Sequence, residues 1–124
     1  MPATFHYVPG LRLAEMRFEG KVSVEDIRSA TAGVLTHPQF GPDLRILVDA
    51  RGMDPTFSSG EIVQYQEWRK QYPQFAKIAI VAATDFEFGF ARMFELATNA
   101  VGTVEMHIFR DTAAARAWLG LPGA

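Results

Sequence analysis

Cysteine is absent from this chain of 124 residues. Without thiols there is no disulfide framework, no thiolate nucleophile and no thiolate metal site, and a reducing compartment, the cytoplasm, is the simplest expectation. An excess of positive charge is also missing, because 12 basic residues face 14 acidic ones and give a formal net charge of -2. Nucleic acid is therefore not an expected partner, since phosphate binding requires clustered cations.

Long apolar runs are missing as well. Charged residues between Arg12 and Glu19 interrupt the first twenty positions, which leaves no apolar stretch of the roughly 7 to 15 residues found in a secretory signal. The most apolar window, Ile78–Ala83, is followed closely by Asp85 and is far shorter than the about 18 to 20 residues of a transmembrane helix. Apolar residues make up 48% and charged residues 21%, as in ordinary globular proteins, so we expect one domain spanning residues 1–124.

Strand and helix signals alternate along the chain. Pro9–Gly10 separates two extended segments, Thr4–Val8 and Leu11–Glu19, as in an antiparallel hairpin. Nearly continuous apolar runs at Leu44–Ala50 and Lys77–Ala83 are typical of parallel strands buried on both faces. A last strand is predicted at 104–109, and helices at 24–36, 60–72, 86–101 and 111–120. The order ββαβαβαβα predicts an α/β fold with a mainly parallel five-stranded sheet covered by helices on both faces.

The apolar spacing of two helices predicts which faces turn inward. In the second helix the stripe is Ile62, Tyr65, Trp68 and Tyr72, and in the third it is Phe86, Phe90, Met93, Phe94, Ala97 and Val101. Phe88 lies on the opposite side of the third helix, with Arg92, Glu95 and Asn99. A single exposed Phe needs no explanation, but a homodimer contact or the lip of an apolar ligand pocket would also account for Phe88 beside Arg92. Tyr65 could line such a pocket, although core packing is its more ordinary role.

Candidate binding residues follow the central strands. Ligands of open parallel sheets collect outside the carboxyl ends of the strands, where this chain places Asp49, Arg51, Asp54, Ser58, Ser59, Asp85 and Arg92. The alternative is that the acids cap helices and turns while the arginines are solvated. His6, His37 and His107 lack metal-ligand spacing, and no Gly-x-Ser-x-Gly elbow occurs, so we expect neither a metal or other cofactor nor serine hydrolase chemistry.

Several segments in this order resemble the SpoIIAA-like group of STAS domains, including the branch called STAS/SEC14-like. They are Arg17–Gly20 leading into a helix, Leu44–Asp49, Lys77–Val81, Phe109–Asp111 and Ala117–Leu119. The resemblance covers nearly the whole chain and implies the SpoIIAA-like fold. Its best understood members are anti-sigma-factor antagonists switched by serine phosphorylation, in which an Asp precedes a Ser-Ser-Gly motif.

The corresponding spacing is present here, because Ser58-Ser59-Gly60 begins nine residues after Asp49. Phe57 stands where the switch proteins usually have Asp, and Glu61 follows Gly60. A phosphate on either serine would lie at a helix N-terminus, which favours negative charge, but Glu61 would repel it. Ser58-x-x-Glu61 is also the pattern of an ordinary capping box.

Three hypotheses follow. The first is a non-enzymatic regulatory or binding module that engages a protein partner or a small apolar ligand at the C-terminal rim of the sheet. The second is a phosphorylation-switched anti-sigma-factor antagonist with Ser58 or Ser59 as phosphosite. The third is an enzyme that works through Asp49, Arg51 and Asp85, for which the sequence offers no nucleophile or cofactor.

Overall fold

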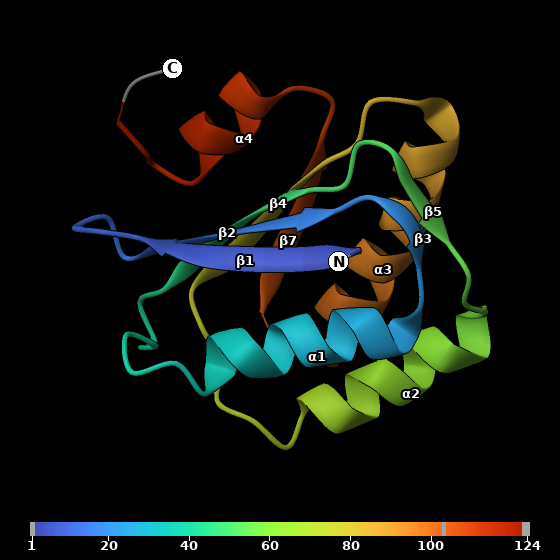
Figure 1. Cartoon of the computed structure of the whole chain (residues 1–124), viewed down its shortest axis with the longest axis horizontal. Coiled ribbons are helices and arrows are strands. Elements are labelled where there is room, and N and C mark those ends of the chain that lie inside the picture. Colours follow the sequence, from blue (N-terminus) through green and yellow to red (C-terminus); the bar gives the residue numbers. More distant parts are fainter. Residues whose placement is uncertain (1, 103, 123–124) are drawn as a thin grey trace.

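The structure is a computed structural model that describes residues 2–102 and 104–122. Its main sheet has five strands in the order β1-β2-β4-β6-β7, of which β1 is antiparallel to β2 and the others are parallel (Figure 1). The bounds are β1 Ala3–Val8, β2 Leu13–Phe18, β4 Arg45–Asp49, β6 Lys77–Val81 and β7 Glu105–Phe109. The helices are α1 Val24–Leu35, α2 Ser59–Arg69, α3 Asp85–Val101 and α4 Thr112–Trp118. The predicted α/β fold with a mainly parallel five-stranded sheet is thus confirmed.

The two apolar runs form the centre of the sheet. β4 and β6 pair in parallel with Ile46 opposite Ile78 and Val48 opposite Ile80. Because side chains alternate between the faces of a strand, Ile46 and Val48 enter the larger core while Leu47 enters a second, smaller one. Burial on both faces explains why these strands are apolar nearly throughout.

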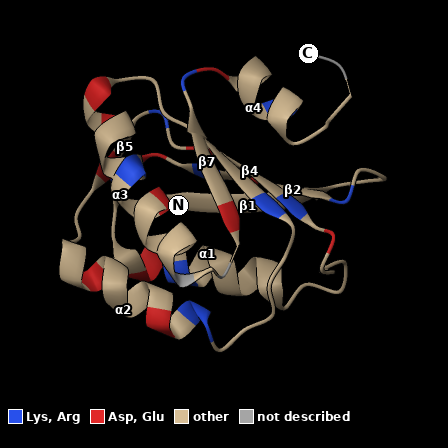
Figure 2. Cartoon of the chain, turned by 180° about the vertical axis from the view of Figure 1, so that it is seen from behind, with Lys and Arg blue, Asp and Glu red and all other residues tan. Residues whose placement is uncertain are grey.

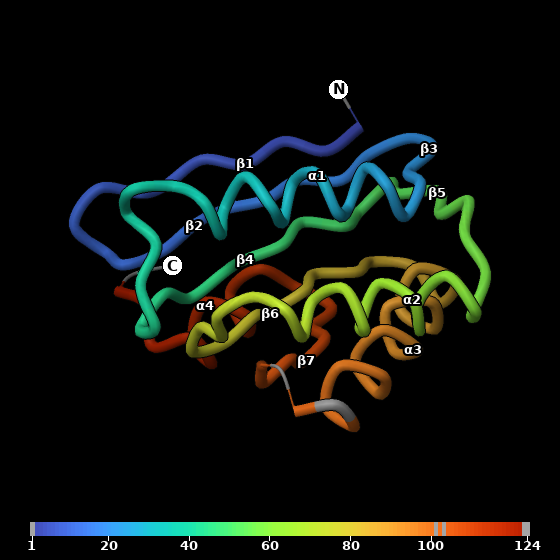
Figure 3. Tube along the Cα trace, turned by 90° about the horizontal axis from the view of Figure 1, so that it is seen from below, coloured from blue at the N-terminus to red at the C-terminus, as the bar shows by residue number. Residues whose placement is uncertain are grey.

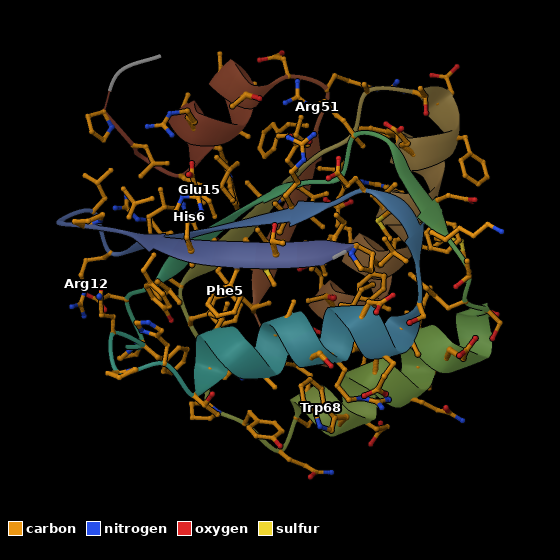
Figure 4. All side chains as sticks on the ribbon, viewed as in Figure 1. Phe5, His6, Arg12, Glu15, Arg51 and Trp68 are labelled. Carbon is orange, nitrogen blue, oxygen red and sulfur yellow. The ribbon has the colours of Figure 1, made fainter. Side chains whose placement is uncertain are left out.

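The two faces of the sheet are covered unequally. The larger core lies between the sheet and α1, α2 and α3, whereas the smaller one lies under α4 alone. Figure 1 shows α4 above the sheet and α1 and α2 below it, and Figure 3 shows α1 and α2 side by side in front of the strands. At the β1–β2 edge, Phe5 points toward α1, while His6 and Glu15 point to the other face (Figure 4). Nε2 of His6 lies 2.9 Å from Oε1 of Glu15 there.

Capping boxes begin the three long helices. Ser23, Ser58 and Thr84 each accept a hydrogen bond from the backbone N–H three residues ahead, and the acidic side chain at that position accepts one in return. α3 ends at Gly102, whose φ of 78° lies in the left-handed region that glycine adopts most readily. These local signals explain why the predicted helix positions agree with the structure within a few residues.

Two short strands were not predicted. β3 (Gly20–Val22) pairs in parallel with β5 (Met53–Pro55), and the Gly20 N–H donates to the carbonyl of Gly52 at 3.0 Å. Each has only three residues, so neither carries a detectable alternation of apolar and polar side chains. In the chain, β3 follows the carboxyl end of β2 and β5 follows the carboxyl end of β4.

The predicted inward stripe of α3 is wrong by about a quarter of a helical turn. Phe86 is 64% exposed and Met93 42% exposed, whereas Glu95 and Thr98 are buried with Phe94. Tertiary contacts explain this rotation, because Thr98 receives a hydrogen bond from Gln66 of α2 and the Glu95 carboxylate lies 3.3 Å from Nδ1 of His107 on β7. The side chain of Val101, also placed in that stripe, lies outside the described residues.

Candidate functional site

Asp49 and Arg51 lie together at the carboxyl end of β4. The Arg51 guanidinium donates to both carboxylate oxygens, at 2.9 Å from Nε and 3.0 Å from Nη2. Arg17 lies nearby, with 3.7 Å between its Nη1 and the Asp49 carboxylate. Hydrogen bonding from Arg51 lowers the pKa of Asp49 against the opposing effect of burial, so this carboxylate is ionised at neutral pH and already paired.

The start of α3 is tied to the turn after β4 through Glu87. One carboxylate oxygen accepts from the N–H groups of Ala83 at 2.9 Å and Thr84 at 3.2 Å, and the other accepts from Gly52 at 2.9 Å. Partial burial opposes ionisation, but these backbone donors lower the pKa of Glu87. Sequence reasoning did not single out this residue. The Thr-x-x-Glu pattern could have predicted that Glu87 caps the helix, but nothing in the sequence predicts its contact with Gly52.

Asp85 and Phe88 share one partner, Arg110. Arg110 donates to the Asp85 carboxylate at 2.9 Å and to the Ala83 carbonyl at 3.0 Å. Its guanidinium carbon also lies 4.4 Å from the centre of the Phe88 ring, which is cation–π geometry. Phe88 is therefore half-buried against a side chain of its own chain. This contact explains the aromatic residue without a second protein copy.

Two of the predicted rim residues lie elsewhere. Tyr65 is buried in the core, where its hydroxyl lies 2.9 Å from that of Thr31, and burial raises its pKa. Arg92 pairs with Glu95 along α3, next to His107 of β7. The structure therefore groups Asp49, Arg51, Asp85 and Phe88 around the Glu87 contact.

The two serines lie at the start of α2 and are exposed. Ser58 Oγ accepts from the Glu61 N–H at 3.3 Å, and the Glu61 carboxylate accepts from the Ser58 N–H at 3.0 Å. Ser58 is thus the N-cap, as its spacing indicated, and Ser59 is the first helical residue. Phosphorylation of either serine stays a prediction.

An apolar cavity of about 90 Å³ lies between the sheet and the helices α1, α2 and α3. The sheet and all three helices contribute side chains to its walls. They are Met16, Phe18, Ile46, Val48 and Ile80 from the sheet, Ile27 and Thr31 from α1, Tyr65, Gln66 and Arg69 from α2, and Phe90, Ala91, Phe94 and Thr98 from α3. Phe57 joins the aromatic wall, with ring centres 5.0 Å from Phe90 and 6.0 Å from Phe94. No sequence motif marks this cavity, because its walls come from segments far apart in the chain.

The cavity extends to the rim described above. Met53, Pro55, Glu87 and Phe90 line this end and are half-buried, whereas Gln66, Phe94 and Thr98 further inside are buried. Glu87, which bonds the turn at Gly52, is thus also a wall of the cavity. The predicted rim and the cavity meet at this residue.

Polar groups enter the cavity from α2 and α3. Gln66 is 2% exposed and donates from Nε2 to the Thr98 hydroxyl at 2.9 Å. Arg69 is 3% exposed, donates from Nη1 to the Tyr72 carbonyl at 3.2 Å, and has its guanidinium carbon 5.1 Å from the centre of the Phe75 ring. The sequence offered one signal for both residues. Gln66 stands four positions after Ile62 and Arg69 four positions after Tyr65, on the same helical face as these apolar residues.

Charges of the two signs are interspersed over the view from behind in Figure 2. Within residues 2–102 and 104–122, no group of three or more His, Asp and Glu could hold a metal ion. No helix in this part of the chain is long and apolar enough to cross a membrane.

A mainly parallel sheet entered through a hairpin, with three helices on one face and a short fourth on the other, defines an α/β domain of the STAS type. A family model described as SpoIIAA-like matches residues 13–120, which is most of the chain. The chain therefore belongs to the SpoIIAA-like family, as its sequence resemblance indicated.

A solved structure supports the same fold. The crystal structure of an uncharacterised protein with a SpoIIAA-like fold from Shewanella loihica is similar, with a TM-score of 0.58 over 94% of this chain and 91% of that one. Sequence identity between the two is 18%, so the likeness concerns the fold. A search of curated proteins finds no match.

Proposed function

We propose that this chain is a non-enzymatic binding module of the cytoplasm that takes up a small apolar ligand in the cavity beneath α1, α2 and α3. The observation that carries the proposal is the cavity itself, whose walls are mostly aliphatic and aromatic side chains with a few polar ones. Small-molecule sites are typically concave and apolar with a few polar groups that orient the ligand, and this cavity has that composition.

The volume sets the size of the ligand. A cavity of about 90 Å³ holds roughly six to nine non-hydrogen atoms, if each needs the about 10–15 Å³ that one water requires on the same measure. Compact molecules such as toluene or a six-carbon chain fall in this range, whereas intact phospholipids do not. Entry at the end lined by Met53, Pro55 and Glu87 follows from the partial exposure of these residues.

Toluene is a suitable first probe, with binding measured by thermal unfolding and by NMR shifts of methyl groups lining the cavity. Binding to the native state alone stabilises it by about 2.7 kcal/mol when the free ligand reaches 100 times its Kd. Ala91→Leu adds three carbon atoms at a lining position and should abolish the effect. The matched control is Ala100→Leu, an equal change at an exposed position of the same helix. No stabilisation of the unmodified protein, or equal stabilisation of both variants, would contradict the proposal.

The phosphorylation switch remains the alternative, and the exposure of both serines at the start of α2 favours it. A phosphate on Ser59 would add negative charge to the first turn without replacing the Ser58 cap. Mass spectrometry of the protein isolated from cells, with Ser58→Ala and Ser59→Ala variants, tests this function. Unmodified serines together with normal behaviour of the double variant would rule it out.

A further inference from the structure

Arg69 is a buried cation whose charge is incompletely matched. Its Nη1 donates to the Tyr72 carbonyl, but its Nη2 is buried without a hydrogen-bond partner among the described residues. No carboxylate of residues 2–102 or 104–122 lies within ion-pair distance of it. Burial lowers the pKa of Arg69, yet a guanidinium stays protonated at neutral pH. A buried charge of this kind is costly unless an anion or other acceptor reaches it.

Gln66 presents a second unmatched group on the same helical face. Its Nε2 is used by Thr98, while its Oε1 is buried without a partner among the described residues. Residues three positions apart are neighbours on a helix, so Gln66 and Arg69, which both line the cavity, bring a buried free oxygen and a buried free nitrogen to the same side of it from adjacent turns. One is an acceptor and the other a charged donor.

We infer that the ligand is a compact apolar monocarboxylate whose carboxylate accepts from Arg69 Nη2 and whose hydrocarbon part packs against Phe94, Phe57 and Ile80. This assignment rests on the proposed function and names its ligand class. A charge-assisted hydrogen bond in an apolar site is stronger than a neutral one, and the ligand supplies the anion that the chain does not. A hydroxyl next to the carboxylate would also donate to Gln66 Oε1, so hydroxylated acids should bind more tightly than unsubstituted ones.

Arg69 also places the carboxylate within the cavity. Arg69 is the last residue of α2. The cavity is lined near the start of β6 by Phe75 and Ile78 and just before β7 by Val104, so this end of the cavity lies at the amino ends of these strands. Met53 and Glu87 line the opposite end, near the carboxyl ends of those strands. The ligand therefore lies along the helix face, with its head group near Arg69 and its tail toward Phe57 and Phe90.

The test compares hexanoate, hexan-1-ol and hexylammonium with the full chain at pH 7, by calorimetry and NMR. We expect hexanoate to bind at least about tenfold more tightly than hexan-1-ol, and hexylammonium not to bind. Arg69→Met should weaken hexanoate at least about tenfold while leaving hexan-1-ol unchanged or tighter, and Arg69→Lys should retain part of the preference. Lys70→Met is the matched control, since it removes an exposed cation from the next position.

The outcomes separate the two proposals. Hexan-1-ol binding as tightly as hexanoate would overturn the assignment to carboxylates but leave an apolar binding module in place. Failure of all three compounds and of toluene would overturn both. A crystal structure grown with hexanoate should show its carboxylate on Arg69 Nη2, and ordered waters alone at that position would overturn the inference. Arg69→Met should not lower the stability of the ligand-free protein, because it removes a buried, incompletely paired charge.

Discussion

The Glu87 contact makes one perturbation especially informative, the replacement Glu87→Gln. In the native protein one carboxylate accepts from three backbone N–H groups, two at the start of α3 and one at Gly52. A glutamine has a single acceptor oxygen, so it can keep the cap or the contact with Gly52, but not both. The remaining hydrogen bonds also lose the assistance of the negative charge.

The expected loss is about 1–2 kcal/mol of the free energy of unfolding at pH 7. We obtain it from one hydrogen bond lost and two weakened, discounted because Glu87 is only partly buried. For a domain of this size that corresponds to roughly 4–8 °C in Tm. Asp85→Asn is the matched control, because it neutralises a fully exposed carboxylate with one surface ion pair and should change the stability by less than about 1 kcal/mol.

The pH dependence gives the sharper test. The pKa of Glu87 is lower in the folded protein than the about 4.3 of an unperturbed glutamate, so its contribution is complete above that value and is lost as the pH falls through the folded pKa. The difference between the native protein and Glu87→Gln should therefore shrink as the pH falls below about 4. Urea unfolding from pH 7 to pH 3 measures it, and a difference that stays constant would refute the role assigned to this carboxylate.

Further predictions concern local packing and capping. Gly33→Ala should destabilise the protein by about 1–3 kcal/mol although alanine favours helices, because the new Cβ would lie 2.5 Å from Cε1 of Phe5; urea unfolding of the Gly33→Ala/Phe5→Leu double variant should show recovery. Ser58→Ala should cost about 1 kcal/mol and Ser59→Ala less than about 0.5, since only Ser58 caps α2, and equal losses in thermal unfolding would argue against that assignment. Phe86→Ser should leave the free energy of unfolding within about 0.5 kcal/mol, because Phe86 is 64% exposed; a larger loss would restore Phe86 to the core.

The contact of Phe88 with Arg110 bears on how the protein associates. Phe88 was the residue that suggested a homodimer, but its ring is already engaged within the chain. The large apolar side chains that are exposed lie on α2 and α3 and include Val63, Phe86, Met93 and Leu96. Association of this chain with a second copy or a protein partner stays a prediction, and Phe88 no longer supports it.

Local chemistry in the sequence was sufficient for the element order and the family. The apolar runs around Ile46 and Ile80 are continuous because both faces of those strands are buried, and Ser23 and Ser58 begin helices because their side chains cap free N–H groups within three residues. These causes act over a few neighbouring positions, so they are visible in the sequence. They placed Asp49, Arg51 and Asp85 at one rim of the sheet.

Tertiary structure alone decided the rotation of α3, the β3–β5 pair and the cavity. A helix with apolar residues on more than one side can pack with any of several faces toward the core. Here contacts of Glu95 and Thr98 with other elements fix the face that packs inward, and this orientation leaves Phe86 exposed. The cavity arises where the sheet and three helices leave space between them, which no single segment encodes. Gln66 and Arg69 share the helical face of Ile62 and Tyr65 in the sequence, but only the packing of α2 against its neighbours decides that these two polar side chains are buried.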